Sequence, residues 1–447
     1  MHSKERSSEM KRMCSSTSDV VSDLPDNILE KILVLMPIRD AVRTSVLSKK
    51  WRYTWRTIPE LVFDDKSLVE PYPILFRQGF PPVHLPTKDR FLASIYHVLL
   101  FHRGAIFKFI LSISKLESCS EIDSLITFLS SGGIQELTLQ IWKGGPHKLP
   151  RSLFSCQQLT QLNLKYCVFG PPTTFKGFQR VVCLELCDVI ITAGTFQTLV
   201  SSCPLLEQLK FESSACFDYI GIDAPNLKVL SLTGFFKSLS VKNAPHLSDF
   251  SLHSKCLKNL WGVKDRRLEW TGLLDGLPVL ENLHMGGLYV VFFAAGWKFI
   301  GKRLLMLRPL NVLELSDVLL GTAIVFQFIW LMITNSPKLQ RLTIQAIPSS
   351  KDDEVAVLKI CEATMVSSDF YLKQLREVEM RFVSGTTSEL HIMKLLLAYS
   401  PILEIMVVKP HPAKVTDGGL RILKELSQFQ RLSPKAKITY KHRNVRN

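Results

Sequence analysis

Few side chains in this sequence stand at spacings that support chemistry. Glu185 and Asp188 are carboxylates three residues apart, and paired carboxylates can act as a general acid and base. We interpret them as a solvated face in and just after a strand. His97 and His102 lie on a leucine-rich helix beside Arg103. A metal site needs several converging ligands, and the sequence places no further ligand set near these two histidines. We therefore expect core or surface histidines.

Motifs with an established mechanism do not occur in the sequence, which contains no GxSxG, HExxH, GxGxxG or Walker loop. Cys183 and Cys187 flank a leucine-rich strand, and we expect them in the core. The turn at 142–145, WKGG, follows another strand and lines either a ligand surface or a plain loop between repeats. We therefore predict no catalytic, cofactor-binding or metal-binding residue and no enzyme.

The composition is that of a folded protein of several parts, with 447 residues, 46% hydrophobic and 21% charged. The ten cysteines are irregularly spaced and form no CxxC pair, which indicates reduced thiols in the nucleus or cytoplasm. The polar N-terminus has no apolar core of a signal peptide. Apolar runs at 288–300 and 318–333 are shorter than the roughly 18–20 residues of a membrane span, so we expect buried helices and no membrane partner.

The net charge of +15 permits binding to nucleic acid or to an acidic partner. The basic residues are scattered, with modest clusters at Lys4–Arg12 and Lys435–Arg446. A solvated basic tail explains the second cluster better than a phosphate contact does, and we regard nucleic acid as an unlikely partner.

The stretch 19–64 carries apolar residues at helical spacing. It predicts three short helices: Asp26–Met36 ended by Pro37, Ala41–Leu47 capped by Asp40, and a third capped by Ser48 with Trp51 and Trp55 on one face. A segment this short cannot bury all of its apolar side chains internally. Part of its surface is therefore expected to be covered by another protein.

The strings LPDNILEKIL and IRDAVRTSVLSKKWRYTW within this stretch resemble an F-box of the type found in plant F-box/LRR proteins. The resemblance implies docking onto the Skp-type adaptor of an SCF ubiquitin ligase, and through it onto cullin and RING subunits. A local three-helix cap on a repeat domain is the alternative. The expected adaptor contacts, some of which must pack internally instead, are Leu24, Pro25, Ile28, Leu29, Ile32, Val46, Leu47, Trp51 and Trp55.

A leucine-rich unit recurs from Ile134 onward in the form φ-x-x-φ-x-φ, where φ is apolar. Its intervals run from 20 residues, Leu227 to Leu247, to 36 residues, Leu339 to Leu375, in and above the leucine-rich-repeat range of about 20–29. The eleven units begin at Ile134, Leu159, Val181, Leu206, Leu227, Leu247, Leu280, Leu310, Leu339, Leu375 and Leu403.

Stacked units bury leucines that no unit can bury alone, which predicts an α/β solenoid with parallel strands concave and helices convex. Six units follow a proline that we expect to end the preceding helix: Pro204, Pro225, Pro245, Pro278, Pro337 and Pro401. The position of the consensus Asn is mostly apolar, so we expect turns without an amide ladder and a loose, irregular solenoid. An ordinary α/β protein with leucine-rich strands is the alternative.

The segment after 366 runs strand, turn at Ser384 and Gly385, helix Glu389–Ala398, strand, and a closing strand within Arg431–Tyr440. It resembles the FBD domain that ends many plant F-box/LRR proteins. From its residues alone, we interpret this segment as a terminal α/β cap over the last edge of the solenoid. The expected organisation is a disordered N-terminus at 1–18, an F-box at 19–64, a Pro-rich connector at 65–88, leucine-rich repeats at 89–365 and an FBD domain at 366–443.

The resemblance implies a non-catalytic substrate receptor whose repeats and FBD domain hold a target protein for ubiquitination. The alternative is a basic LRR scaffold or nucleic-acid-binding protein without a ubiquitin role. The sequence predicts neither the target nor a small-molecule ligand.

Overall fold

The computed structural model describes residues 24–65, 87–114, 116–255, 273–300, 307–347, 371–415 and 419–441. The chain divides into two compact units, Met1–Phe178 and Gln179–Asn447. The predicted disordered N-terminus and nearly all of the Pro-rich connector lie outside the described residues. None of the helices within the described ranges combines the length and apolarity that crossing a membrane requires.

Unit 1 begins with the predicted three-helix arrangement. Its elements are α2 (Asp26–Val34), α3 (Ile38–Arg43) with a 3₁₀ turn (Thr44–Val46), α4 (Trp51–Thr54) with a 3₁₀ turn (Trp55–Thr57), and β1 (Glu60–Asp64). The predicted cap at Ser48 is displaced: Lys50 is the N-cap of α4, although the Oγ of Ser48 does accept the N–H of Trp51 at 3.4 Å. The predicted cap at Asp40 is wrong: Pro37 starts the helix and its carbonyl accepts the N–H of Asp40 at 2.8 Å, which places Asp40 inside α3.

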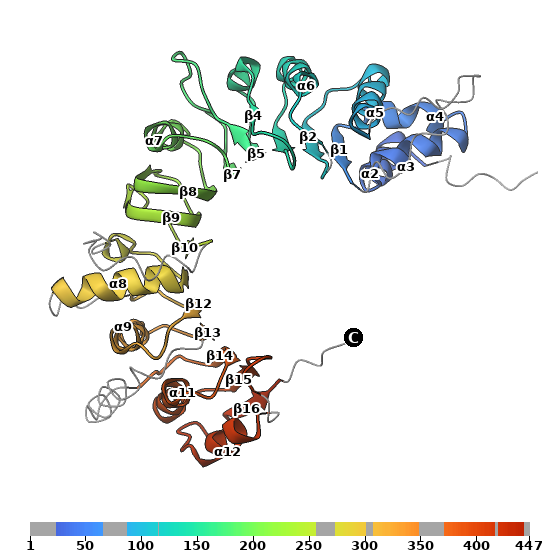
Figure 1. The fold of residues 1–447 in the computed structure, drawn as a ribbon. Coiled ribbons are helices and arrows are strands. Elements are labelled where there is room, and N and C mark those ends of the chain that lie inside the picture. Colours follow the sequence, from blue (N-terminus) through green and yellow to red (C-terminus); the bar gives the residue numbers. More distant parts are fainter. Residues whose placement is uncertain are drawn as a thin grey trace, which may run out of the picture. The chain divides into compact units, whose positions relative to one another are not determined.

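The remainder of unit 1 alternates helices with short parallel strands (Figure 1). Its elements are α5 (Thr87–Phe101), β2 (Lys108–Ser112), α6 (Ser120–Ser131), β3 (Glu136–Gln140), β4 (His147–Lys148), a 3₁₀ turn (Arg151–Ser155), β5 (Gln161–Lys165) and β6 (Cys167–Val168). The strands β1, β2, β3 and β5 pair in that order, with Leu61, Phe109, Leu137 and Leu162 in register. β1 therefore joins the three-helix segment to the repeats, a connection that the sequence did not reveal.

Unit 2 continues the same construction. Its elements are β7 (Cys183–Cys187), α7 (Ala193–Ser201), β8 (Gln208–Asp223), β9 (Val229–Lys242), β10 (Asp249–His253), a 3₁₀ turn (Leu274–Gly276), β11 (Asn282–Gly286), α8 (Gly287–Ile300), β12 (Val312–Val318), α9 (Ala323–Thr334), β13 (Arg341–Ala346), β14 (Glu377–Val383), α11 (Thr387–Tyr399), β15 (Ile405–Pro410), α12 (Leu420–Gln428) and β16 (Lys437–Tyr440).

The strands β7 to β16 pair in sequence order, and every pair is parallel. The inward column in register is Leu184, Leu209, Leu230, Phe250, Leu283, Leu313, Leu342, Val378, Met406 and Ile438. Helices α7, α8, α9 and α11 lie on one side of this row of strands (Figure 1). The predicted leucine-rich α/β architecture is confirmed. Each of the eleven leucine-rich repeats supplies one parallel strand, in unit 1 or in unit 2.

The role predicted for the prolines is confirmed only in part. Pro204, Pro337 and Pro401 follow the helices α7, α9 and α11. Pro225 and Pro245 instead follow the long strands β8 and β9, where no helix intervenes between consecutive strands. β8 takes up 16 residues and β9 takes up 14, which leaves room only for a turn in each of these intervals of about 20 residues.

The turns after four strands share one backbone conformation. Tyr166, Asp188, Asp317 and Phe382 have φ between 49° and 58°, in the left-handed region. Each stands directly before the apolar residue that occupies the consensus Asn position. One left-handed residue therefore reverses the chain at each of these four turns, in place of an amide ladder.

Candidate functional site

The nine apolar residues expected to contact an adaptor divide into two groups. Leu29, Trp51 and Trp55 are at most 4% exposed and pack within the three-helix segment. Val46 and Leu47 are 76% and 64% exposed. We use the name F-box apolar surface for the members that reach solvent, which are Leu24, Pro25, Ile28, Ile32, Val46 and Leu47.

Helix α2 positions its apolar residues on two adjacent stripes. Leu29 and Leu33, four residues apart, are buried. Ile28, Ile32 and Leu35, separated by four and three residues, face away from that core, and Leu35 is 87% exposed. The outward stripe is therefore apolar although Ile28 and Leu35 are exposed and Ile32 is only half-buried.

Lys50 brings the two ends of this surface together. Its Nζ donates to the carbonyl oxygen of Leu24 at 2.5 Å and lies 3.3 Å from Asp26. The start of α2 is thereby held beside the segment that follows Val46 and Leu47. The apolar side chains at both places can consequently contact one partner.

Two exposed apolar residues of this segment were not among the nine. Leu35 and Tyr53 are 87% and 54% exposed. The signal for Leu35 was available in its spacing from Ile28 and Ile32. Tyr53 gave no comparable signal, because a short helix of four residues has no measurable periodicity.

A charged network covers the outward face of β11 to β15 in unit 2. Glu314 lies 3.3 Å from His284 and accepts a hydrogen bond from Arg381 at 3.0 Å. Arg381 also donates to Glu379, which pairs with Lys409. The Arg381 hydrogen bond, aided by Lys409 and opposed by burial, lowers the pKa of Glu379 to about 2. These side chains are mutually neutralised, and the network offers polar contacts rather than a reactive group.

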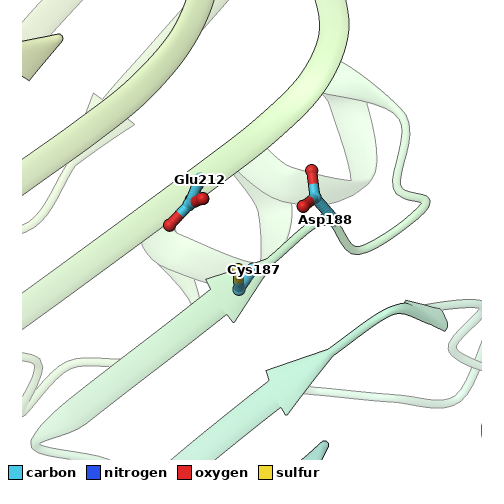
Figure 2. A group of neighbouring side chains, drawn as sticks. All are labelled: Cys187, Asp188 and Glu212. Carbon is cyan, nitrogen blue, oxygen red and sulfur yellow. The ribbon is translucent and has the colours of Figure 1, made fainter. Parts of the chain in front are cut away.

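Cys187, Asp188 and Glu212 form a group whose ligand atoms lie within 4.8 Å of one another (Figure 2). The ammonium of Lys255 lies 2.8 Å from Asp188 and 3.0 Å from Glu212, so a cation already balances both carboxylates. Burial would raise the pKa of Asp188, but hydrogen bonds from Lys255 and Ser214 outweigh it and lower that pKa. The arrangement stabilises a turn and needs no metal to do so.

The two cysteines of β7 do not lie where the sequence predicted. Cys183 and Cys187 were expected in the core, but both are half-exposed on the outward face of β7. Leu184 and Leu186 occupy the inward positions, and side chains of a strand alternate between faces. Glu185 shares the outward face, 3.9 Å from Lys210, as a solvated carboxylate should.

Asp188→Ala is expected to lower the free energy of unfolding by about 1–2 kcal/mol, because the backbone N–H and the hydroxyl of Ser214 both lose their acceptor. Asp188→Asn is expected to cost less, since asparagine tolerates the left-handed conformation and keeps an acceptor oxygen. Urea denaturation measures both. Glu185 lies on the neighbouring strand β7 and pairs with the exposed Lys210, so Glu185→Ala should change stability by only about 0.5 kcal/mol. Equal losses at both positions would contradict this role for Asp188.

His147 stands between a hydroxyl and a carboxylate in unit 1. Its Nδ1 lies 3.0 Å from Ser118 Oγ, and its Nε2 lies 3.1 Å from Asp123. The imidazole is 3% exposed, and burial lowers its pKa although Asp123 acts in the opposite direction. Serine, histidine and aspartate in this order resemble a hydrolytic triad. We interpret His147 instead as a buried imidazole that holds β4 in place. His97 and His102, by contrast, pack against Phe101 and the carbonyl of Ile58.

An apolar groove of about 630 Å³ lies between α5 and α6. Its lining includes Tyr96, Leu100 and Phe128, which are 39%, 78% and 51% exposed. No Asp, Glu, Lys or Arg is among the described residues that line it. The groove offers mainly apolar contact, with Tyr96, His97 and Ser124 as the polar side chains of this lining.

Comparison with known proteins identifies both parts of the chain. Residues 21–62 match the family model of the F-box domain, and residues 122–269 match that of the LRR repeats of the FBD-associated F-box protein At5g56370. The Arabidopsis thaliana F-box/FBD/LRR-repeat protein At1g13570 is 34% identical over 432 residues, covering 94% of this chain and 98% of that protein. The F-box/LRR-repeat protein At2g42730 of the same plant is 25% identical over 95% of this chain and 98% of its own.

F-box proteins with leucine-rich repeats are generally non-catalytic adaptors. The F-box implies an Skp-type adaptor as a partner, and the repeats imply a protein–protein contact. On sequence identity, coverage and architecture, the chain belongs to the F-box/FBD/LRR-repeat family.

Proposed function

We propose that this chain is the substrate-receptor subunit of an SCF-type ubiquitin ligase. The F-box apolar surface binds the Skp-type adaptor, and the repeats together with the C-terminal region at 366–443, which we assign to an FBD domain, bind the target protein. The observation that carries the proposal is the exposure of Val46 and Leu47 beside the start of α2, in a segment whose own core is already filled. Exposed apolar side chains clustered in this way mark protein interfaces.

The mechanism is proximity rather than catalysis by this chain. The adaptor connects the receptor to a cullin and a RING subunit that carries a charged conjugating enzyme. A target held on the repeats then has its lysines at a high effective concentration near the thioester. The chain contributes binding and orientation, and the bond-making groups belong to the other subunits.

Val46→Asp combined with Leu47→Asp is expected to abolish capture of the Skp-type adaptor. Each side chain is mostly solvent exposed, so the fold should persist, while two buried carboxylates would weaken an apolar interface by about 2 kcal/mol or more, roughly thirtyfold. Co-purification of adaptor with the wild-type chain and the variant measures this, with circular dichroism as the test of folding.

Leu420→Asp is the matched control, because Leu420 is 73% exposed but lies in α12 of unit 2. It should leave adaptor capture unchanged. Failure of the wild-type chain to bind any Skp-type adaptor, together with nucleic-acid binding that weakens steeply with salt, would favour the basic scaffold instead.

A further inference from the structure

Unit 1 carries two exposed aromatic side chains where β3 and β5 end. Trp142 is 46% exposed and Tyr166 is 36% exposed. The strands pair with Gln140 beside Lys165, so the two aromatic residues follow neighbouring strand ends. We use the name aromatic turn cluster for Trp142, Lys143, Lys165 and Tyr166.

The cluster is held in a fixed geometry. The ammonium of Lys165 lies 3.5 Å from the ring centroid of Trp142, a cation–π contact that orients the indole. The carbonyls of Lys165 and Tyr166 accept the N–H groups of Ile141 and His147 at 3.2 Å and 3.1 Å. Side chains fixed before binding lose less conformational entropy when a partner arrives.

Tyr166 occupies a strained position that the fold does not require to be aromatic. Its φ is 57°, a conformation that bulky residues rarely adopt. At the equivalent turns of unit 2 the chain places Asp188 and Asp317, which tolerate this conformation better, and Phe382, which is bulky as well. Tyr166 therefore carries backbone strain while 36% of its surface stays exposed to a partner.

The charge of the cluster selects the partner. Lys143 is exposed, and neither it nor Lys165 forms an ion pair with a carboxylate in the part of the chain that the structure describes. Tryptophan and tyrosine are the residues that most often dominate protein interfaces. A nucleic acid is less well matched, because one face of the indole is already covered by Lys165 and the cluster contains only two cations.

Resting on the proposed function, we propose that the aromatic turn cluster binds an acidic segment of the target protein. The segment inserts an apolar side chain between Trp142 and Tyr166 and places carboxylates beside Lys143 and Lys165. This assigns target recognition to the strand ends of unit 1, in addition to the outward faces of the strands.

Selection of random peptides displayed on phage, against the full-length chain bound to adaptor, tests the proposal. Enriched peptides should be acidic with an apolar residue. Their affinity should fall about tenfold or more with Trp142→Ala, Tyr166→Asn or Lys165→Glu. Tyr166→Asn should at the same time raise the thermal midpoint, because asparagine relieves the backbone strain while the contact is lost.

Phe382→Asn is the matched control, since Phe382 has a φ of 57° and is 37% exposed in unit 2. It should raise the midpoint similarly and leave peptide affinity unchanged. Peptides that bind the three cluster variants as tightly as the wild type would overturn the proposal, as would a poly-thymidine oligonucleotide that binds at this cluster in their place. Adaptor capture is scored separately, so a failure of the ligase role is distinguishable from a failure of this contact.

Discussion

Trp55→Ala is expected to destabilise the F-box by about 3–5 kcal/mol and to remove adaptor binding with it. Trp55 is 4% exposed in the 3₁₀ turn that follows α4, and it packs inside the three-helix segment. A tryptophan buries roughly 150–250 Å² of surface, and so small a segment cannot collapse around the cavity that alanine would leave. The loss of binding is therefore a consequence of lost structure.

Denaturant unfolding followed by near-ultraviolet circular dichroism, alongside adaptor capture, measures both effects. Tyr53→Ala is the control, since Tyr53 lies two residues earlier and is 54% exposed, so its stability should change little. Val46→Asp with Leu47→Asp should show the opposite combination, with stability retained and capture lost. A Trp55→Ala variant that unfolds like the wild type but no longer captures adaptor would mean that Trp55 contacts the adaptor directly.

The leucine-rich strands were predictable because one physical constraint defines them. A strand in a stacked repeat must alternate its side chains, and only the inward positions need to be apolar. Leu184 and Leu186 satisfy this requirement, as do Leu313 and Leu315, and all four are fully buried. The regular pattern therefore located the strands even where the intervals between them varied.

The partition of the F-box residues was less predictable. Both Leu29 and Ile28 are apolar and lie on one helix, yet only Leu29 is buried. Spacing identifies an apolar stripe, but a stripe that covers half of the helix can face a core, a partner or both. The burial of Leu29 depends on the packing of α2 against the neighbouring helices, which no single-helix pattern encodes.

The helix α12 and the length of β8 and β9 were also missed. In α12 the buried Ile422 and Leu426 are four residues apart, so their spacing carried a helical signal even though the helix is short. In β9, Gly234 accepts a hydrogen bond from the hydroxyl of Tyr289 on α8, and this distant contact supports the extended strand. Contacts between residues so far apart in sequence leave no local pattern.

Gly287→Ala is expected to destabilise unit 2 by about 3 kcal/mol, although alanine normally improves a helix by about 1 kcal/mol. Gly287 begins α8 directly after β11, and a Cβ placed there would overlap the carbonyl oxygen of Asp317. That carbonyl cannot easily move, because Asp317 has a φ of 58° and its carboxylate accepts a hydrogen bond from Gln345 at 2.7 Å. The glycine is required for the close approach of a helix start to a neighbouring turn.

Gly194→Ala is the matched control, because Gly194 lies in the first turn of α7 and a Cβ there would meet nothing within 4 Å. Thermal unfolding should show a higher midpoint for this variant and a lower one for Gly287→Ala. Equal gains would mean that the turn at Asp317 yields to the added methyl group. Because the F-box lies in unit 1, Gly287→Ala should leave adaptor capture unchanged.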